Sequence, residues 1–289
     1  MAAKPAALTA ETGANRRSEK GRILLKAGAN GGPGGWHSGG HPIARLRCQH
    51  LLGARVMKVL VVDVGGTRVK LRASDAAEPR RFESGPTLPP GRLVEEVLSA
   101  TRDWDYEVIS LGYPGKISQG APVAEPGHLG DGWVGFDFRA AFGRPVRIVN
   151  DAVMQALGGY EGGRMLFLGL GTGLGTALVT EHVVVPMELG DLPHLGAGTL
   201  GDAMGAGGLE RLGCDAWRRL VIDAIGTLRK ALIADYTLIG GGNAAKIEPL
   251  PPATRLGGND DAFRGGFRLW EEFVEPHDRV PDSVWRVLR

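Results

Sequence analysis

The sequence predicts an α/β protein, because short apolar runs alternate with segments of helical periodicity from Met57 onward. The run Lys58–Val62 is typical of a buried strand. Leu93, Val94, Val97 and Leu98 recur at helical spacing inside Pro90–Trp104. Gly is abundant, at 46 of 289 residues, which indicates tight turns or loops that approach a ligand closely.

The expected elements alternate along the chain, and each apolar run of strand length is bounded by turn-prone residues. The expected strands are Lys58–Val62, Val69–Ala73, Tyr106–Leu111, Val146–Val149, Met165–Leu170, Leu174–Thr180 and Tyr236–Ile239. The expected helices are Pro90–Trp104, Asp151–Tyr160, Leu209–Ile233 with a break near Gly213, and Asp260–Phe273, before a polar tail. The pattern is weakly two-fold, since each half has a strand pair joined by a Gly-Thr turn.

Length and composition favour a globular protein large enough for two lobes. Apolar residues make up 43% of the chain, and no apolar run reaches membrane-spanning length. Cys48 and Cys214 are far apart and form no CxxC motif, so no disulfide framework or zinc site is expected. We therefore expect a cytoplasmic protein with no membrane partner.

The charge is unevenly distributed. Residues 1–56 hold nine Lys or Arg and two Glu, whereas residues 57–289 hold 25 Lys or Arg and 30 Asp or Glu. The leader has no sustained periodicity and is expected to be disordered. Scattered basic residues without a helix-turn-helix pattern argue against a nucleic-acid-binding arm, and the lack of an apolar core argues against a targeting peptide. A start codon assigned too early, with Met57 as the true start, is the favoured interpretation.

Two glycine-rich turns predict phosphate binding. Gly65, Gly66 and Thr67 follow the first strand, and Gly171, Thr172 and Gly173 lie between two later strands. Such turns expose backbone N–H groups and let a phosphate approach, while the threonines add hydroxyl donors. Asp63, at the end of the first strand, could hold a hydrated Mg²⁺ against those phosphates. The alternative is a pair of plain hairpins; neither turn is a Walker A loop or a Rossmann fingerprint.

Asp151 is the candidate catalytic base, because phosphorylation of a hydroxyl needs a base beside it. It follows a strand and opens a helix, so its carboxylate is expected at a cleft beyond the carboxyl end of the strand. The alternative is a helix N-cap, a position that both Asn150 and Asp151 suit. Asn150 can also donate to and accept from a sugar hydroxyl.

The motifs together resemble those of the ROK group of sugar kinases, in the actin-like superfamily, and most of all its polyphosphate-type glucokinases. The resemblance runs from Met57 to about Trp270. It rests on "DVGGT" at Asp63–Thr67, "GYPG" at Gly112–Gly115, "NDA" at Asn150–Ala152, "GLGTGLGTAL" at Gly169–Leu178, "GGLERLG" at Gly207–Gly213 and "IGGGN" at Ile239–Asn243. No single motif is decisive, but their order and spacing are specific.

The resemblance implies a two-lobed actin-like (ribonuclease H-like) sugar kinase fold. The lobes would span residues 57–149 and 150–289, with the final helix packing back on the first lobe. It also implies a hexose-binding set, with the catalytic base at Asp151, and a nucleotide side. The hexose-binding set is Gly112, Pro114, Asn150, Asp151, Glu188 and Asp191; the nucleotide side is Gly240, Gly241, Gly242 and Asn243.

The chain departs from this pattern at two places. Asp191 stands where the family motif ExGH has histidine, so an acceptor replaces a group that can also donate, and its charge is close to Glu188. No Lys or Arg occurs between Arg164 and Arg211, although polyphosphate needs a cationic track. Arg68, Lys70 and Arg72 alternate on one strand and could supply a track or form a solvated face.

The expected function is transfer of a phosphoryl group from polyphosphate or ATP, with Mg²⁺, to the 6-hydroxyl of glucose or a related hexose. A homodimer would be usual for the group, and no nucleic-acid partner is expected. The alternative is a non-catalytic sugar sensor or regulator of the same fold, since the group includes repressors. The presence of Asp63 and Asp151 favours the kinase.

Overall fold

The computed structural model describes residues 57–194, 198–271 and 286–287, the last two by their backbone only. The expected disordered leader, Cys48 and the polar tail, apart from residues 286–287, lie outside the described residues. The fold is mixed α/β, as expected, with two main sheets and two short two-stranded ribbons. In the part of the chain that the structure describes, no helix is long and apolar enough to cross a membrane.

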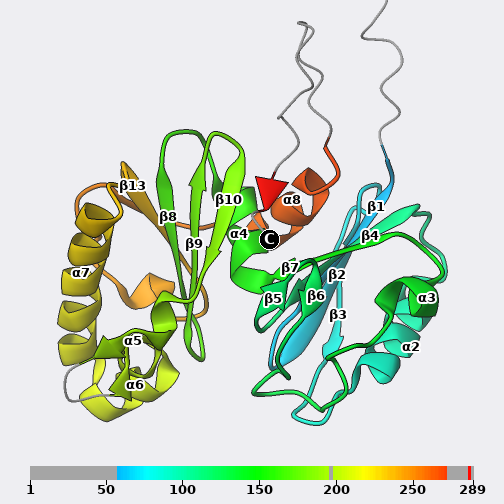
Figure 1. Cartoon of the computed structure of the whole chain (residues 1–289), viewed down its shortest axis with the longest axis horizontal. Coiled ribbons are helices and arrows are strands. Elements are labelled where there is room, and N and C mark those ends of the chain that lie inside the picture. Colours follow the sequence, from blue (N-terminus) through cyan, green and yellow to red (C-terminus); the bar gives the residue numbers. More distant parts are fainter. Residues whose placement is uncertain (1–56, 195–197, 272–285, 288–289) are drawn as a thin grey trace, which may run out of the picture. The chain divides into compact units, whose positions relative to one another are not determined.

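The first sheet has five strands in the order β3-β2-β1-β4-β7 (Figure 1). The strands are β1 (Val59–Val64), β2 (Arg68–Ala73), β3 (Arg80–Glu83), β4 (Val108–Tyr113) and β7 (Val146–Asn150). β1 is buried along its whole length and lies between an antiparallel and a parallel neighbour, β2 and β4. A continuous apolar run fits such a central position, because both faces of the strand are covered.

The second sheet has six strands in the order β14-β13-β8-β9-β10-β15. The strands are β8 (Met165–Leu170), β9 (Leu174–Thr180), β10 (Val183–Met187), β13 (Tyr236–Gly240), β14 (Thr254–Leu256) and β15 (Arg286–Val287). From β10 to β14 this sheet repeats the pairings of the first one, with two antiparallel pairs followed by two parallel pairs. The two-fold pattern in the sequence therefore corresponds to a repeated sheet topology.

The helices fall into groups by the sheet that they cover. They are α2 (Pro90–Ala100), α3 (Phe138–Phe142), α4 (Asp151–Gly159), α5 (Leu200–Met204), α6 (Ala206–Leu212), α7 (Cys214–Ala231) and α8 (Asp261–Arg268). Residues of α2 and α3 share a core with the first sheet. Trp217, Val221 and Ile225 of α7 share one with the second sheet, along which α7 runs (Figure 1).

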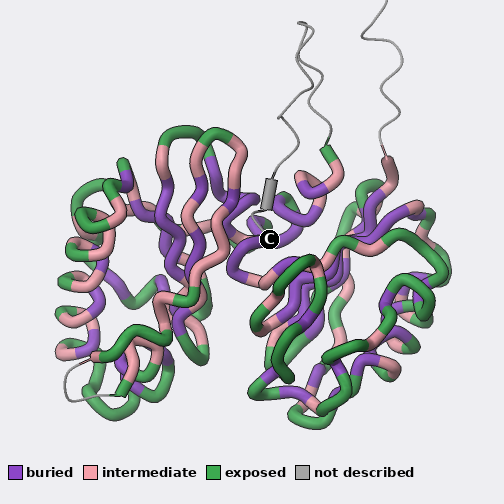
Figure 2. The backbone as a smooth tube through the Cα atoms, viewed as in Figure 1, coloured by how far each residue is buried: buried purple, intermediate pink, exposed green. Residues whose placement is uncertain are grey.

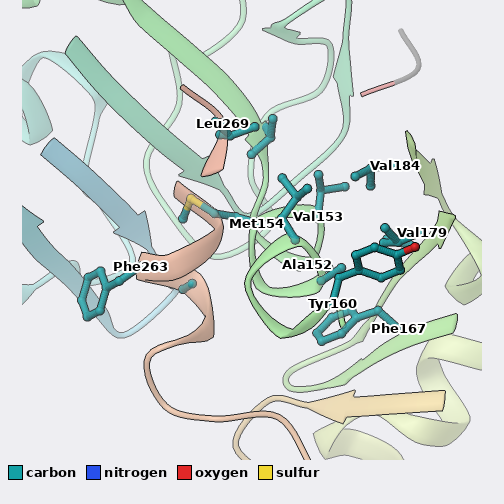
Figure 3. Close-up of a cluster of buried hydrophobic side chains, with 14 of the residues drawn as sticks. Ala152, Val153, Met154, Tyr160, Phe167, Val179, Val184, Phe263 and Leu269 are labelled. Atoms are coloured by element: carbon teal, nitrogen blue, oxygen red, sulfur yellow. The ribbon is translucent and has the colours of Figure 1, made fainter. Parts of the chain in front are cut away.

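A third core surrounds α4 and α8, which are buried over much of their length (Figure 2). Figure 3 shows Val153 and Met154 of α4 among Phe167 and Val179 of the second sheet and Phe263 of α8. The two helices approach closely at small residues, since a Cβ at Gly158 or at Gly265 would overlap the backbone of the opposite helix. α8 also contacts β1 and β4, so it joins the first sheet to α4.

The expected elements are present, but several of their boundaries were wrong. The first helix ends at Ala100 rather than Trp104: Thr101 leaves the helical dihedrals, with φ −116° and ψ 15°, while its backbone N–H and its hydroxyl both donate to the Val97 carbonyl. α8 ends at Arg268 rather than Phe273. The unexpected elements are short or at sheet edges: β3, β10, β14, β15, α3, α5, the ribbons β5 (Ile117–Ser118) with β6 (Ala121–Pro122) and β11 (Pro193–His194) with β12 (Gly198–Thr199), and the 3₁₀ turns η1 (Leu189–Asp191) and η2 (Ala244–Lys246).

Candidate functional site

A cavity of about 420 Å³ is lined by residues from both sheets and from the start of α4. Its volume is in the range of small-molecule sites. Nine of the residues expected in the site line it: Gly66, Pro114, Asn150, Asp151, Gly171, Thr172, Gly173, Glu188 and Gly241. Residues scattered over 176 positions of sequence, from Gly66 to Gly241, thus meet in one place.

Both glycine-rich turns reach this cavity. Gly66 comes from the β1–β2 turn, and Gly171, Thr172 and Gly173 come from the β8–β9 turn. A Cβ at Gly171 or Gly173 would meet no atom within 4 Å, so packing does not require glycine there. The absence of side chains at both positions gives a ligand access to the backbone of this turn, although the Gly171 N–H itself donates to the Gly169 and Gly173 carbonyls, both over 3.2 Å. Gly65 and Thr67 flank Gly66 but do not line the cavity.

Asp63 is a buried carboxylate at the end of β1, three residues before Gly66, with an exposed fraction of 7%. Burial raises the pKa of Asp63, and the ammonium of Lys70, 3.4 Å away, opposes this rise. No group of three or more metal-ligating side chains occurs among the described residues. Asp63 itself is not among the residues that line the cavity, but it lies three residues before Gly66, which is. Mg²⁺ is commonly held by one or two carboxylates together with phosphates and water, so a single aspartate at this position could supply one ligand to a donor-bound Mg²⁺.

Asp151 is the first residue of α4 and follows β7 directly, which places its carboxylate at the cavity. Burial raises its pKa to about 7, and the negative charges of Asp63 and Glu188 add to the rise. The Ala152 N–H, which donates to Asp151 Oδ1 over 2.8 Å, acts in the opposite direction. A carboxylate with a pKa near neutrality is suited to accept a proton from a hydroxyl.

Asn150 is the N-cap of α4. Its Oδ1 accepts from the Ala152 N–H over 2.8 Å, and its Nδ2 donates to the Gly115 carbonyl over 2.9 Å. Asn150 therefore caps the helix, which was one of the two alternatives from the sequence, and it also lines the cavity. The second bond fixes the loop after β4 against the start of α4.

The loop after β4 contributes Pro114 and Gly115 to the cavity, whereas Gly112 does not line it. Gly112 lies within β4, and a Cβ there would overlap the end of the Met154 side chain on α4. Glycine at position 112 thus allows α4 to pack closely on the first sheet. Its place in the expected hexose set has no direct geometric support, because the backbone is covered by Met154.

Glu188 lines the cavity, and Asp191 lies beside it on η1, outside the lining. Asp191 Oδ2 pairs with Lys116 Nζ at 2.6 Å. Burial raises the pKa of Glu188; the charge of Lys116 opposes the rise and that of Asp191 adds to it. The two acidic charges are thus accompanied by a cation. That cation is Lys116. His194, which the sequence suggested as a compensating group, lies on β11 and pairs with Gly198.

Gly241 lines the cavity beside the second turn, and its φ is +82°. A Cβ there would lie 2.6 Å from the Leu170 carbonyl oxygen, so only glycine fits. Asn243 supports the same turn: its backbone N–H donates to Leu170 O over 2.9 Å, and its Nδ2 donates to Gly171 O over 3.4 Å. Gly240 and Gly242 do not line the cavity.

Gln155 and His128 also line the cavity and were missed from the sequence. Gln155 lies one helical turn after Asp151, so the i, i+4 spacing could have indicated it. His128 lies in the loop before Trp133, with its Cβ 3.4 Å from where a Gly66 Cβ would be. No local pattern marks His128, because only the tertiary fold brings it to the β1–β2 turn.

No Lys or Arg is among the residues that line the cavity. Arg68 and Lys70 are exposed on β2, and Arg72 pairs with Asp260 at 3.6 Å and lies over the Phe263 ring. The alternating basic residues of β2 therefore split, with Lys70 beside Asp63 and Arg72 directed to α8.

Comparison with curated proteins finds two sugar kinases; no family model matches the chain. It is 25% identical over 209 residues to a polyphosphate glucokinase from Mycobacterium leprae (66% of this chain, 60% of the relative). It is 26% identical over 176 residues to an N-acetylmannosamine kinase from Vibrio vulnificus (55% of this chain, 59% of the relative). The chain thus spans about three fifths of the length of these relatives.

Solved structures share the fold. An inorganic polyphosphate/ATP-glucomannokinase from Arthrobacter sp. strain KM has a TM-score of 0.63 at 23% identity, covering 73% of this chain and 97% of that one. A ROK family glucokinase from Streptomyces griseus, in complex with glucose and AMPPNP, has a TM-score of 0.56 at 18% identity, covering 72% and 97%. The chain therefore has the actin-like fold of these sugar kinases, and its resemblance to kinases of the ROK family is confirmed.

Proposed function

We propose that this protein is a sugar kinase, with Asp151 as its catalytic base and glucose or a related hexose as its acceptor. The observation that carries the proposal is the position of Asp151: a carboxylate with a pKa of about 7 in a cavity that both glycine-rich turns line. Phosphoryl transfer needs a positioned base and phosphate donors close together, and few other parts.

In the proposed reaction, the oxygen of the sugar 6-hydroxyl bonds to the terminal phosphorus of the donor, while Asp151 accepts the proton of that hydroxyl. The bond between that phosphorus and the donor's bridging oxygen breaks, and the shortened donor leaves. Backbone N–H groups of the two turns would bind the phosphates, and Glu188 would accept hydrogen bonds from sugar hydroxyls. When bound at Asp63, Mg²⁺ would neutralise phosphate charge.

The phosphoryl donor is polyphosphate or ATP in this proposal. The names of the relatives support both, since they include a polyphosphate glucokinase and a polyphosphate/ATP-glucomannokinase. Because the cavity lining has no Lys or Arg, Mg²⁺ bound to the donor would have to neutralise the phosphate charge with either donor. N-acetylmannosamine belongs in the acceptor panel because a relative is a kinase for it.

The test is formation of sugar phosphate by the full chain. Glucose, mannose and N-acetylmannosamine would each be incubated with Mg²⁺ and either ATP or polyphosphate, with products identified by ³¹P NMR. Turnover with at least one pair supports the proposal and names the donor. Hexose binding by the folded protein without turnover on any pair would instead support a sugar sensor of the same fold.

A further inference from the structure

An ion pair joins two chain segments that each supply a neighbouring residue to the candidate cavity, although neither partner of the pair lines the cavity itself. Lys116 Nζ lies 2.6 Å from Asp191 Oδ2, across 75 positions of sequence. Lys116 directly follows Gly115, and Asp191 lies three residues after Glu188; both Gly115 and Glu188 line the cavity. The ammonium is therefore at the Glu188 end of the cavity, on the loop that Asn150 fixes.

The polar side chains at this end are mainly hydrogen-bond acceptors. Asp151 and Glu188 only accept when they are ionised. The Asn150 amide already uses one of its two N–H donors on the Gly115 carbonyl, and its oxygen accepts from Ala152, so it has one N–H left for a ligand. A neutral hexose, however, presents ring and hydroxyl oxygens that need donors as well as acceptors. An ammonium has three N–H donors, and the bond to Asp191 uses one of them.

Folding stability does not explain this ion pair. The Lys116 and Asp191 side chains are 50% and 64% exposed, and pairs at such exposure contribute little to stability. Asp191 restrains the long, flexible side chain of Lys116. The Lys116 side chain therefore loses less entropy when it binds a ligand. Lys116 also opposes the rise in the pKa of Glu188 that burial causes, which favours the ionised acceptor.

We infer that Lys116 is a sugar-binding residue whose ammonium donates hydrogen bonds to hexose oxygens beside Glu188. Asp191 holds this ammonium in place. This inference rests on the proposed function, since it assigns the sugar to the Glu188 end of the cavity. It also accounts for the aspartate at position 191, where the family motif ExGH has histidine. Asp191 cannot donate when ionised, but the lysine that it holds can.

The experiment is calorimetric titration of the full-length protein with glucose, mannose and N-acetylmannosamine, without donor. We expect Lys116→Met to weaken binding of the preferred hexose about tenfold and Asp191→Asn about threefold, as is typical for loss of a charged hydrogen bond and of its restraint. The double variant should bind no more weakly than Lys116→Met, because Asp191 acts through Lys116. Lys116→Arg should retain most of the affinity.

The matched control is Arg92→Met, which removes the exposed pair of Arg92 and Glu96 on α2 (2.6 Å) and should leave hexose binding unchanged. In turnover assays, Lys116→Met should raise the KM for hexose and leave that for the donor unchanged. A wild type that binds none of the hexoses would refute the proposed function itself. If the wild type binds a hexose and Lys116→Met binds it with equal affinity, only the role of Lys116 is overturned. If the losses of affinity in the two single variants add in the double variant, the role of Asp191 is overturned.

Discussion

Two features of its surroundings have opposite effects on the pKa of Asp151. As the first residue of α4 it receives a hydrogen bond from a helix N-terminal N–H, which favours its charge. Burial beside Asp63 and Glu188 disfavours that charge more strongly and raises its pKa to about 7. The site therefore holds a carboxyl group that changes protonation in the physiological range.

The first prediction concerns the pH dependence of turnover. If Asp151 must be ionised to accept the sugar proton, kcat/KM should fall about tenfold per pH unit below pH 7 and be level above it. Steady-state kinetics between pH 5 and 9 would measure this. A level profile down to pH 5 would contradict the role of Asp151 as base.

The second prediction concerns stability. Between pH 4 and 7 the folded protein keeps a proton on Asp151 that the unfolded chain has released, so this group lowers the free energy of unfolding as pH rises through that window. Asp151→Asn should thus stabilise the protein at pH 8, by at most about 4 kcal/mol, and much less at pH 4. Urea unfolding at the two pH values would check the sign; a loss of stability at pH 8 would contradict it.

At the residue scale, the sequence was informative where function and local position coincide. Asp151 and Asn150 could be selected because they lie between a strand and a helix. The ion pair of Lys116 with Asp191 could not, since each residue alone has the appearance of a solvated charge. Only the fold brings together side chains 75 positions apart.

At the scale of elements, the contact between α4 and α8 depends on small residues. A third prediction is that Gly265→Ala lowers the free energy of unfolding by about 3 kcal/mol, because its Cβ would overlap the Met154 carbonyl. Gly226→Ala on α7 is the control: it meets no atom within 4 Å and should raise stability by about 0.5–1 kcal/mol. Similar stabilities of the two variants would contradict the packing argument.

The fourth prediction separates ligand binding from folding in the β8–β9 turn. Gly173→Ala adds a methyl group at the cavity without meeting another atom, so it should leave the melting temperature unchanged and raise the KM for the phosphoryl donor roughly tenfold. Gly207→Ala on α6 also meets open space and lies outside the cavity lining, so it should leave the donor KM unchanged, while it raises stability slightly as a helical Gly→Ala change does. An unchanged donor KM in Gly173→Ala would contradict phosphate binding at this turn.

Elements with strong periodicity could be predicted, and short ones could not. β1, α4 and α7 carry long apolar patterns, whereas β3 and β10 lie in stretches too short or too mixed to stand out. The short α5 helix was missed although it could have been predicted, because Thr199 and Asp202 form a capping box that is visible in the sequence. The end of α2 was misplaced because the turn after Ala100 leaves the helical path without a sequence signal such as Gly or Pro.

At the scale of the whole described fold, the repeated sheet topology explains why one cavity has two glycine-rich turns. β1–β2 and β8–β9 occupy equivalent places in the two sheets, so the repeat yields two turns of the same kind. The weak two-fold pattern and the order of the motifs anticipated this arrangement. The sheet order itself, and the core that α4 and α8 share with both sheets, depend on contacts too distant in sequence to be read from it.

The most direct test measures hexose binding and phosphoryl transfer on the same preparations of the wild type and Asp151→Asn. The account predicts that both bind hexose, that the wild type forms sugar phosphate, and that the variant loses at least about 100-fold in kcat, as expected for loss of a general base. Equal turnover by the two proteins, or hexose binding without any turnover by the wild type, would contradict the assignment of Asp151 as the base of a sugar kinase.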